Sequence, residues 1–318
     1  MSGFEIRPFA LSKRGSGDDL TYRAGGVLQT VSSVVDTFGT RRYVDATDGS
    51  DTFDGLSKVT AKATVQAAVT DAVTGDIIYI APGDYDENVT IAVGKPNITL
   101  VGIGARNSVE IVCAGATTAL TVNANEVTLI NIALSGDETA GSIGLLNRGR
   151  ALRYYEGRIL NVETCAKFTL GTPTQVTAGT YGDGSNTLCE DVEFSWATNG
   201  IDLVGVTDAG VGDFGTTQNY FRRCTFHNCS AASITETPLG AAAQSFRDLE
   251  VSDCIFKRVE AGTEPTKYID LDGSNSNSGI VTRCSFPTAL AGGKNLVSTA
   301  VIWVSNYHTG GVSTTVPS

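Results

Sequence analysis

The chain has 318 residues, of which 41% are hydrophobic and 18% charged, and its formal net charge is −11 with a pI near 4.7. Such a chain can bury a large core, and its acidic balance excludes a sequence-independent grip on phosphate backbones, so we expect no nucleic-acid partner. No apolar run approaches the roughly 18 residues of a membrane span, and Met1–Ala10 has no signal-peptide core, so we expect a soluble chain that is not exported.

The first 42 residues differ from the rest of the chain. They hold six Lys/Arg against four Asp/Glu, and the acidic surplus therefore lies in the remainder. A polar, Gly-rich stretch, "SKRGSGDDLTYRAGG", is followed by the apolar "VLQTVSSVVDTF". A basic arm in front of an acidic body predicts a docking segment, although a solvated terminus would give the same charge pattern.

A loop and a short helix are predicted next, within residues 43–75. The loop is rich in Asp, Gly, Ser and Thr, as turns are. In "TVQAAVTDAV" the apolar residues recur at helical spacing, Thr64 is a suitable N-cap, and Gly75 is the predicted end of the helix. The strand "DIIYIAP" and the turn "GDYDENVTI" follow.

From residue 100 onward a local pattern recurs every 29 to 32 residues. Its centres are Ile103, Ile132, Val162, Val192, Cys224, Cys254 and Cys284. Three residues before each centre stand Leu100, Leu129, Ile159, Cys189, Phe221, Val251 and Val281, and two residues after the centres stand Leu134, Thr164, Phe194, Phe226, Phe256 and Phe286. The spacing of two places side chains on one strand face, whereas the spacing of three requires a bend.

Short apolar stretches at this period, with no helical segments between them, predict strands stacked in a parallel coil. Equivalent residues then lie over one another about 4.8 Å apart, in one cysteine column and one aromatic column. We therefore interpret the cysteines as small core residues, reduced and without a metal, and predict no cofactor. The column before the centres holds Asn131, Asn161, Asp191, Arg223, Asp253 and Arg283, which we interpret as register control.

The segment 43–91 resembles the N-terminal part of right-handed parallel β-helix proteins of the pectin-lyase-like superfold. The shared features are Tyr43-Val44-Asp45, Gly49-Ser50-Asp51, Asp54-Gly55, the Ala/Thr-rich helix, Gly75-Asp76 and Pro82-Gly83-x-Tyr85. The resemblance implies an all-β fold, a right-handed parallel β-helix of about eight rungs whose N-terminal end is closed by a capping helix. It divides the chain into an arm (1–42), a loop and capping helix (43–75), the β-helix (76–305) and a C-terminal tail (306–318).

Two groups of residues are candidate sites. The superfold includes polysaccharide lyases that use acids with an Arg or Lys, and the nearest match here is Glu163, Asp191, Glu193 and Arg223. No catalytic motif of the family is matched residue by residue, and outward acids are common on an acidic protein. The loops 171–186, 204–219 and 262–277 precede successive repeats, and solvated turns would look the same. Their candidate binding residues are Tyr181, Asp183, Asp208, Asp213, Phe214, Tyr268 and Asp272.

An unexported body with an arm in front resembles a phage virion protein more than a secreted pectinase. The leading hypothesis is a virion appendage on capsid or tail, docked to other virion proteins through residues 1–42, trimeric as β-helical spikes often are, and able to bind bacterial surface polysaccharide. A depolymerase acting on such a glycan, lyase or hydrolase, is the alternative. A secreted carbohydrate-binding module that has lost its signal is the third.

Overall fold

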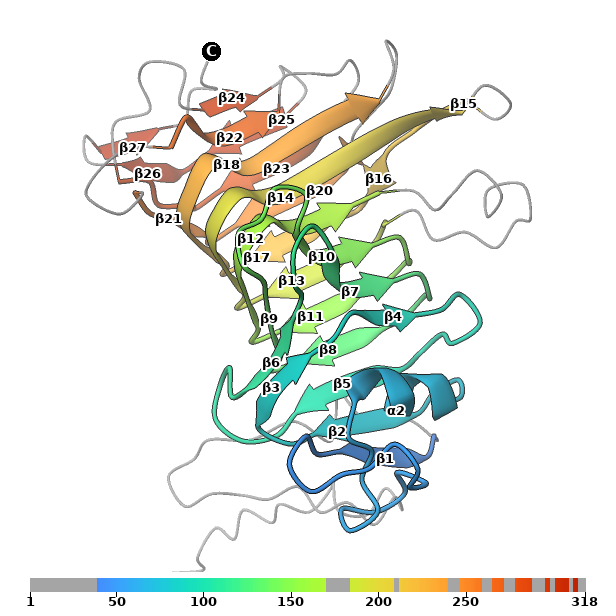
Figure 1. The fold of residues 1–318 in the computed structure, drawn as a ribbon. Coiled ribbons are helices and arrows are strands. Elements are labelled where there is room, and N and C mark those ends of the chain that lie inside the picture. Colours follow the sequence, from blue (N-terminus) through green and yellow to red (C-terminus); the bar gives the residue numbers. More distant parts are fainter. Residues whose placement is uncertain are drawn as a thin grey trace, which may run out of the picture.

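The computed structural model describes residues 39–169, 184–208, 212–239, 246–258, 265–271, 278–287, 295–297, 301–308 and 311–313. Nearly all regular structure in these residues is strand, with a single helix, α2 (Val65–Asp71), at the N-terminal end of the molecule (Figure 1). Among these residues no helix has the length and apolar content that crossing a bilayer requires.

The first sheet is a stack of ten parallel strands. In spatial order they are β1 (Arg41–Val44), β2 (Ile77–Ile80), β5 (Thr99–Gly102), β8 (Thr128–Ile130), β11 (Arg153–Tyr155), β13 (Leu188–Glu190), β17 (Tyr220–Arg222), β20 (Leu249–Ser252), β23 (Gly279–Thr282) and β25 (Val301–Val304). Neighbours in space are thus separated in sequence by other strands, so the chain leaves this sheet and returns one strand further along.

The second sheet consists of two parallel ladders joined by a bend. The first ladder holds β3 (Gly83–Asp86), β6 (Val109–Val112), β9 (Ala133–Ser135), the first parts of β12 (Arg158–Phe168), β14 (Glu193–Asp208) and β18 (Thr225–Leu239), and β21 (Ile255–Phe256). The second ladder holds β4 (Val89–Ile91), β7 (Thr118–Val122), β10 (Ile143–Asn147), the later parts of β12, β14 and β18, then β22 (Lys267–Leu271) and β24 (Asn295–Val297).

Each pass of the chain therefore runs through the first sheet and then through both ladders, which is a parallel β-helix closed by α2, as the sequence predicts (Figure 1). The expected number of rungs stays a prediction. Short additions sit outside this scheme: β15 (Gly212–Phe214) on β14, the pair β16 (Thr216–Thr217) with β19 (Phe246–Arg247), and the antiparallel pair β26 (Asn306–His308) with β27 (Gly311–Ser313).

The predicted aromatic and cysteine columns fill the interior. The rings of Phe226, Phe256 and Phe286 are stacked with centroids 4.8 and 4.6 Å apart and planes within 8° of parallel. Cys224, Cys254 and Cys284 are buried beside them, and all seven cysteines of the chain are buried and unpaired. The Cys254 thiol donates weakly to the Phe221 carbonyl of the preceding turn, at 3.3 Å. The cysteines are therefore core residues, as predicted.

The bend required by the spacing of three is a single residue in the left-handed region. Its φ lies between 52° and 57° in every turn where the polar column was predicted correctly, at Asn131, Asp191, Arg223, Asp253 and Arg283. The alternating charges pair: Arg223 contacts Asp191 and Arg283 contacts Asp253, each through two hydrogen bonds of 2.7–3.0 Å. The amide of Asn131 instead donates to the carbonyls of Gly102 and Ala105.

The predicted register is wrong in the turn around residue 160. Tyr154 pairs with Leu129 and Cys189, and Ile159 pairs with Leu134 and Phe194, so Ile159 belongs to the aromatic column. Gly157 occupies the centre position that the sequence assigned to Val162. The reason is the fully buried Tyr154 ring, which fills the space where a side chain of residue 157 would lie. Asn161 consequently lies at the following bend.

Ile103 is also misplaced by the sequence pattern. Its side chain is 36% exposed, and Val109, the first residue of β6, is buried in its stead. The residues between them form an inserted loop, in which the Asn107 amide nitrogen donates to the Asn131 side chain. Because this loop is inserted between the bend and β6, the buried centre position is six residues later, at Val109. Ile103 is also apolar, so the sequence pattern does not reveal the insertion.

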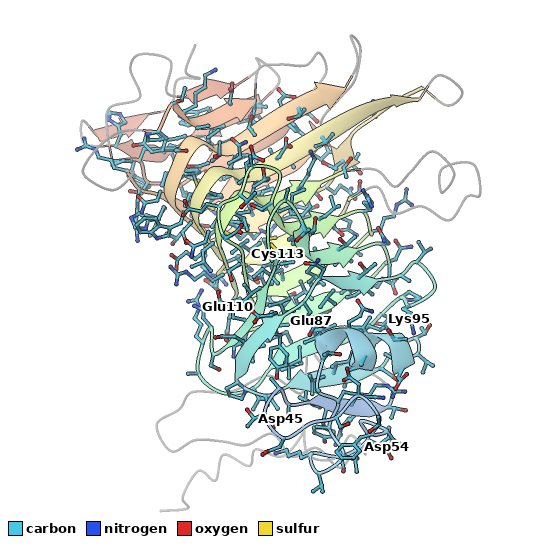
Figure 2. The ribbon with its side chains drawn as sticks, in the orientation of Figure 1. Asp45, Asp54, Glu87, Lys95, Glu110 and Cys113 are labelled. Atoms are coloured by element: carbon cyan, nitrogen blue, oxygen red, sulfur yellow. The ribbon has the colours of Figure 1, made fainter. Side chains whose placement is uncertain are left out.

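Helix α2 closes the N-terminal end of the coil through Val65, Ala68 and Val69, which belong to the main core. Its N-cap is Thr64, as predicted, whose hydroxyl accepts from the Ala67 amide. The helix ends at Asp71, before the predicted Gly75, because Ala72 is extended. Figure 2 shows Glu87 and Lys95 beside the helix.

Both helix ends are held by these two side chains. Glu87 accepts from the Val65 and Gln66 amides at 2.6 and 2.8 Å, and burial raises the pKa of its carboxyl. Lys95 donates to the carbonyls of Thr70 and Ala72 at the other end.

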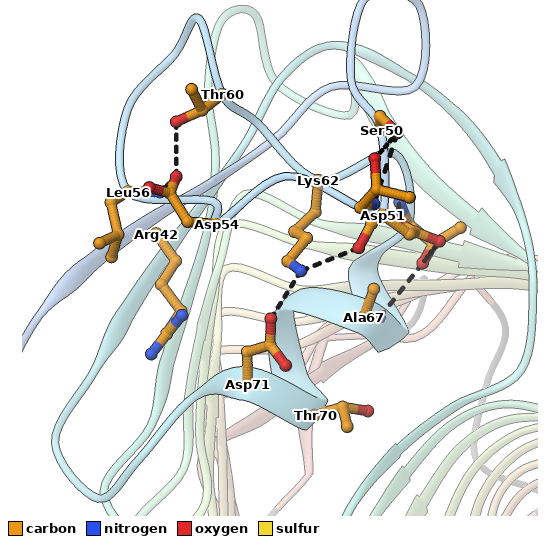
Figure 3. A network of polar contacts seen from close by, with 12 residues as sticks. Arg42, Ser50, Asp51, Asp54, Leu56, Thr60, Lys62, Ala67, Thr70 and Asp71 are labelled. Atoms are coloured by element: carbon orange, nitrogen blue, oxygen red, sulfur yellow. Dashed lines mark hydrogen bonds and ion pairs between the residues drawn. The ribbon is translucent and has the colours of Figure 1, made fainter.

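The loop before α2 is organised around Lys62 (Figure 3). The buried Lys62 ammonium donates to the Asp51 carbonyl at 3.0 Å and pairs with Asp71 at 2.6 Å. The Asp51 carboxylate in turn accepts from Ala63 and Thr64. The loop motif that carries the family resemblance therefore has a structural use, since it fixes the start of the capping helix.

At the C-terminal end a polar side chain terminates the cysteine column. Asn306 is fully buried; its Oδ1 accepts from the Cys284 amide and its Nδ2 donates to the Val281 carbonyl, both at 2.9 Å. Residues 306–308 and 311–313 thus form a hairpin, β26–β27, against the end of the coil. Of the predicted N-terminal arm, residues 1–38 lie outside the described residues, whereas Arg41 and Arg42 belong to β1.

Candidate functional site

An open hollow of about 520 Å³ lies on the outer side of the coil, where the two ladders of the second sheet meet. It is lined by Gly136, Asp137, Glu138, Leu160, Asn161 and Trp196. One wall is the loop that follows β9, the floor is β12, and the other wall is Trp196 from the next strand, β14. Three successive turns of the coil therefore contribute to one open surface.

Trp196 reaches the outside because of its backbone. The inward residue Phe194 stands two positions earlier, so strict alternation would turn Trp196 into the core. Its φ of 52° breaks the alternation at the bend between the ladders, as do Asn161 and Asn228 in the neighbouring turns. The indole is half-buried and lies edge-on to His227, with ring centroids 6.3 Å apart. A partly exposed indole offers an apolar ring with a polar N–H edge.

The opposite wall is acidic. The Asp137 carboxylate accepts from the Gly115 and Thr139 amides, both at 3.2 Å, and hydrogen bonds from Thr139 and Gly115 hold its pKa below the ordinary value. It is therefore ionised at neutral pH. Glu138 is exposed and is fixed through its backbone, whose amide donates to the Asn161 carbonyl at 2.8 Å.

Glu163 supports this wall instead of forming part of the hollow. Its carboxylate accepts from the Gly141 amide, and its own amide donates to the Ser142 hydroxyl at 2.8 Å. Both contacts hold the loop that carries Asp137 and Glu138 against β12. Glu163 is thus a positioning residue for the loop.

The four candidate catalytic residues do not form one cluster. Asp191 and Arg223 are in contact, and Arg223 also pairs with Glu190 at 2.7 Å. Glu193 pairs with Arg158, with 3.4 Å between Oε1 and Nε. Glu163 follows the bend at Asn161, and its neighbours Val162 and Thr164 pair with Ala197 and Asn199 of β14. Asp191 stands at the preceding bend, before β14 begins, so Glu163 does not lie beside it. The register error at Tyr154 is the cause of this misplacement.

The predicted binding residues are only partly within the described region. Tyr181, Asp183 and Asp272 lie outside the described residues, and of Asp208, Asp213 and Phe214 only the backbone is described, at the end of β14 and in β15. Tyr268 was expected in an exposed loop, and this is wrong. It lies in β22, is fully buried, and packs edge-on against Phe256 and Phe286 at 6.3 and 5.9 Å.

The sequence analysis did not predict the hollow, because none of its lining residues belongs to the predicted candidate sites. The sequence feature that could have indicated it is Trp196, one of only two Trp residues in the chain. Among the described residues no group of three or more His, Cys, Asp or Glu is arranged to hold a metal ion. The hollow combines an aromatic residue with two acidic residues, which suits a polyhydroxylated ligand better than an anion.

No protein-family model matches this chain, and no curated protein matches it either. Solved structures do. A rhamnogalacturonan lyase is similar with a TM-score of 0.60 and 15% identity over 85% of this chain and 74% of the other. An alginate lyase from Paenibacillus sp. str. FPU-7 gives 0.54 and 14% over 77% and 83%, and the pectin methylesterase from carrot gives 0.56 and 13% over 86% and 85%.

At these identities the likeness establishes the fold alone: a right-handed parallel β-helix of the pectin-lyase-like kind, as the sequence resemblance implied. The structures named here are polysaccharide lyases and an esterase. None of them is a phage appendage.

Proposed function

We propose that this chain is a polysaccharide-directed protein that binds a neutral glycan in the hollow between the Asp137–Glu138 loop and Trp196. The observation that carries the proposal is that the half-buried Trp196 lines the same open hollow, of about 520 Å³, as Asp137 and Glu138. Three turns of the coil contribute to the hollow, so it spans two interstrand distances, about 10 Å. The solved structures of similar fold, with lyases and an esterase of polysaccharides among them, support the same class of ligand.

The charge of the site supports a neutral ligand. Asp137 is ionised at neutral pH, Glu138 lies beside it, and the chain as a whole carries −11. An anionic polysaccharide would therefore be repelled at low ionic strength, whereas hydroxyl groups can donate to the carboxylates. We expect the affinity for a neutral glycan to change little with salt, and any affinity for an anionic glycan to rise with it.

The chain offers its own fluorescent reporter for the test. Trp196 lines the hollow, while Trp303, the other Trp residue, is 2% exposed in the core. Glycan binding should therefore shield Trp196 from acrylamide quenching and shift the emission to the blue. Titration with neutral and anionic polysaccharides, including lipopolysaccharide and capsule, identifies the ligand class.

Trp196→Ala should weaken binding at least tenfold, which corresponds to about 1.4 kcal/mol. The matched control is Tyr307→Ala, which removes an aromatic side chain that is 48% exposed at the far end of the coil. Equal binding by the Trp196→Ala variant, measured by affinity electrophoresis, would refute the proposal.

A second candidate is cleavage of the bound glycan. The specific observation in its favour is Glu138, an exposed carboxylate at the hollow whose backbone is fixed by Asn161. By contrast Asp191, Glu193 and Arg223 are engaged in ion pairs with one another or with Arg158. New reducing ends or absorbance near 235 nm, abolished in Glu138→Gln but retained in Asp191→Asn, would support cleavage at this position.

A place on a phage particle stays our proposal for the location of the chain, with the predicted arm docked to other virion proteins through the residues that precede β1. It is compatible with binding a host-surface glycan. Co-purification of the chain with particles, and its loss on deleting residues 1–38, supports it, because this deletion leaves Arg41 and Arg42 of β1 in place. Undiminished incorporation of the shortened chain speaks against it. Light scattering of the purified chain decides whether it is the trimer that we predict.

A further inference from the structure

The bend between the two ladders continues past the hollow by one turn of the coil. Asn161, Trp196 and Asn228 occupy this bend in β12, β14 and β18, each with a φ between 52° and 55°. The first two of these residues line the hollow. Asn228 therefore lies directly beyond Trp196, and the shared backbone state turns its side chain toward the outer side of the coil as well.

The residues just before the bend form a second row. Leu160, Ser195 and His227 are in register with one another in the same three strands. Leu160 lines the hollow from outside, and Ser195 follows the inward Phe194, so this row also points outward. Beyond Leu160 and Asn161 the two rows form a square of four neighbouring outward residues, the bend square: Ser195, Trp196, His227 and Asn228.

The polar members of the bend square are buried without partners. Ser195 is 0% exposed and Asn228 5%. Neither the Ser195 hydroxyl nor the Oδ1 and Nδ2 of Asn228 has a hydrogen-bond partner among the described residues. Buried polar groups in native proteins are nearly always hydrogen-bonded, and one that is not destabilises the folded state. Three such atoms on two adjacent residues, at the edge of a hollow, therefore indicate a place where a polar ligand binds.

The aromatic members of the bend square are its exposed part. Trp196 follows Ser195 in the chain, and His227 precedes Asn228; both rings keep intermediate exposure and meet edge-on. Solvent thus reaches the rings but not the polar groups beside them. In the part of the chain that the structure describes, no hydrogen bond holds either ring. Partly exposed side chains change rotamer rapidly, so rotation of the indole is a simple way to give a ligand access to the polar pair.

We propose that Ser195 and Asn228 are ligand-binding residues of the hollow, and that they bind two adjacent hydroxyl groups of a sugar when the Trp196 indole turns aside. This inference rests on the proposed function and names its ligand more closely. A hydroxyl and an amide each donate and accept hydrogen bonds, as sugar hydroxyls do. The two residues stand on neighbouring strands, one position apart along the chain, so they are placed to reach neighbouring hydroxyls.

The acidic residues of the hollow complete this recognition. The carboxylate of Asp137 is ionised and therefore only accepts hydrogen bonds, whereas Ser195 and Asn228 also supply donors. A sugar hydroxyl that is free can donate and accept at once, but an O-acetyl group removes its donor. The ligand is thus a neutral glycan whose sugars carry free vicinal diols.

Measuring both stability and binding of Ser195→Ala tests the proposal. Because the hydroxyl has no described partner in the unliganded protein, its removal should leave the thermal midpoint unchanged or raise it. The affinity for dextran, galactan and mannan, three neutral polysaccharides with free vicinal diols, should fall at least fivefold in affinity electrophoresis. Asn228→Gly, which keeps the left-handed backbone accessible, should lower the affinity by a similar factor.

The matched control is another buried serine, one that does have a partner. Ser252 in β20 is 1% exposed, and its hydroxyl donates to the Glu250 carboxylate at 2.7 Å. Ser252→Ala should therefore show the reverse pattern, a lower thermal midpoint and an unchanged affinity. The O-acetylated forms of the same three polysaccharides should bind the wild type at least fivefold more weakly than the free forms.

The possible failures are distinguishable. Wild-type affinity in both Ser195→Ala and Asn228→Gly, with binding lost in Trp196→Ala, would overturn this inference and leave the proposed function standing. A midpoint that falls in Ser195→Ala as far as in Ser252→Ala would also overturn it, because the Ser195 hydroxyl would then be satisfied within the protein. Equal binding of acetylated and free polysaccharides would exclude the diol as the recognised group. A wild-type chain that binds none of these polysaccharides would contradict the proposed function and this inference together.

Discussion

Replacing Gly157 by alanine should destabilise the protein severely, although it adds a single methyl group. A Cβ at this position would lie 2.1 Å from Cε2 and 2.3 Å from the hydroxyl of Tyr154. Tyr154 is fully buried, and its hydroxyl lies 2.7 Å from the Ile132 carbonyl and 3.2 Å from that of Arg158. The ring therefore cannot move aside without losing its polar contacts.

The magnitude follows from two contributions. Overpacking of a well-packed core costs about 1–3 kcal/mol. Separating the buried Tyr154 hydroxyl from its acceptors adds about 1–3 kcal/mol. The free energy of unfolding should thus fall by roughly 2–6 kcal/mol in total. Thermal unfolding followed by far-UV circular dichroism, at one fixed scan rate, should show a midpoint at least about 4 °C lower.

Two matched variants make this reasoning refutable. Gly94→Ala adds the same methyl where no heavy atom lies within 4 Å, and should leave the midpoint unchanged. In a Tyr154→Leu background the Gly157→Ala change should cost far less than in the wild type, because the obstructing ring is gone. If Gly157→Ala were as stable as Gly94→Ala, the conclusion that the Tyr154 ring fills the space beside Gly157 would be wrong.

Three further predictions concern the stack and its ends. Cys254→Val should be nearly neutral in thermal unfolding, whereas Cys254→Asp should be severely destabilising, because the side chain is buried away from water. Burial raises the pKa of the Cys254 thiol well above its usual range, so a thiol reagent should not label this residue in the folded protein at pH 8. Equal destabilisation by both variants would contradict a packing role. Asn306→Ala should cost about 1–3 kcal/mol in denaturant unfolding, since it leaves the Cys284 amide and the Val281 carbonyl unpaired, and a neutral result would exclude Asn306 as the terminator of the column. The Arg222 guanidinium lowers the pKa of Glu250, so this ion pair stabilises the fold above the ordinary glutamate pKa, and the stabilisation is lost as pH falls through the lowered pKa. Arg222→Gln should therefore be less stable than the wild type near pH 7, by no more than about 1 kcal/mol, and equally stable at low pH. A difference in stability that stays constant at all pH values would rule out the ion pair as its cause.

The sequence by itself determined the coil. A period of about thirty residues, with Cys and Phe columns two residues apart, requires parallel stacking because only that arrangement places equivalent side chains over one another. The bend before Cys224 was also determined, since a spacing of three between two buried positions cannot fit an uninterrupted strand. Thr64 as helix N-cap followed from local chemistry alone.

Only the tertiary structure decided which residues meet at the surface. Gly157 has no side chain to reveal that it holds a core position, and the ring of Tyr154 that fills this position comes from three residues away. Trp196 points outward because its φ is positive, a backbone state that the sequence does not announce in a residue other than glycine. Periodicity and alternation fix what is buried along a regular strand, but at each bend the side-chain direction depends on the backbone, and the candidate site lies at such a bend.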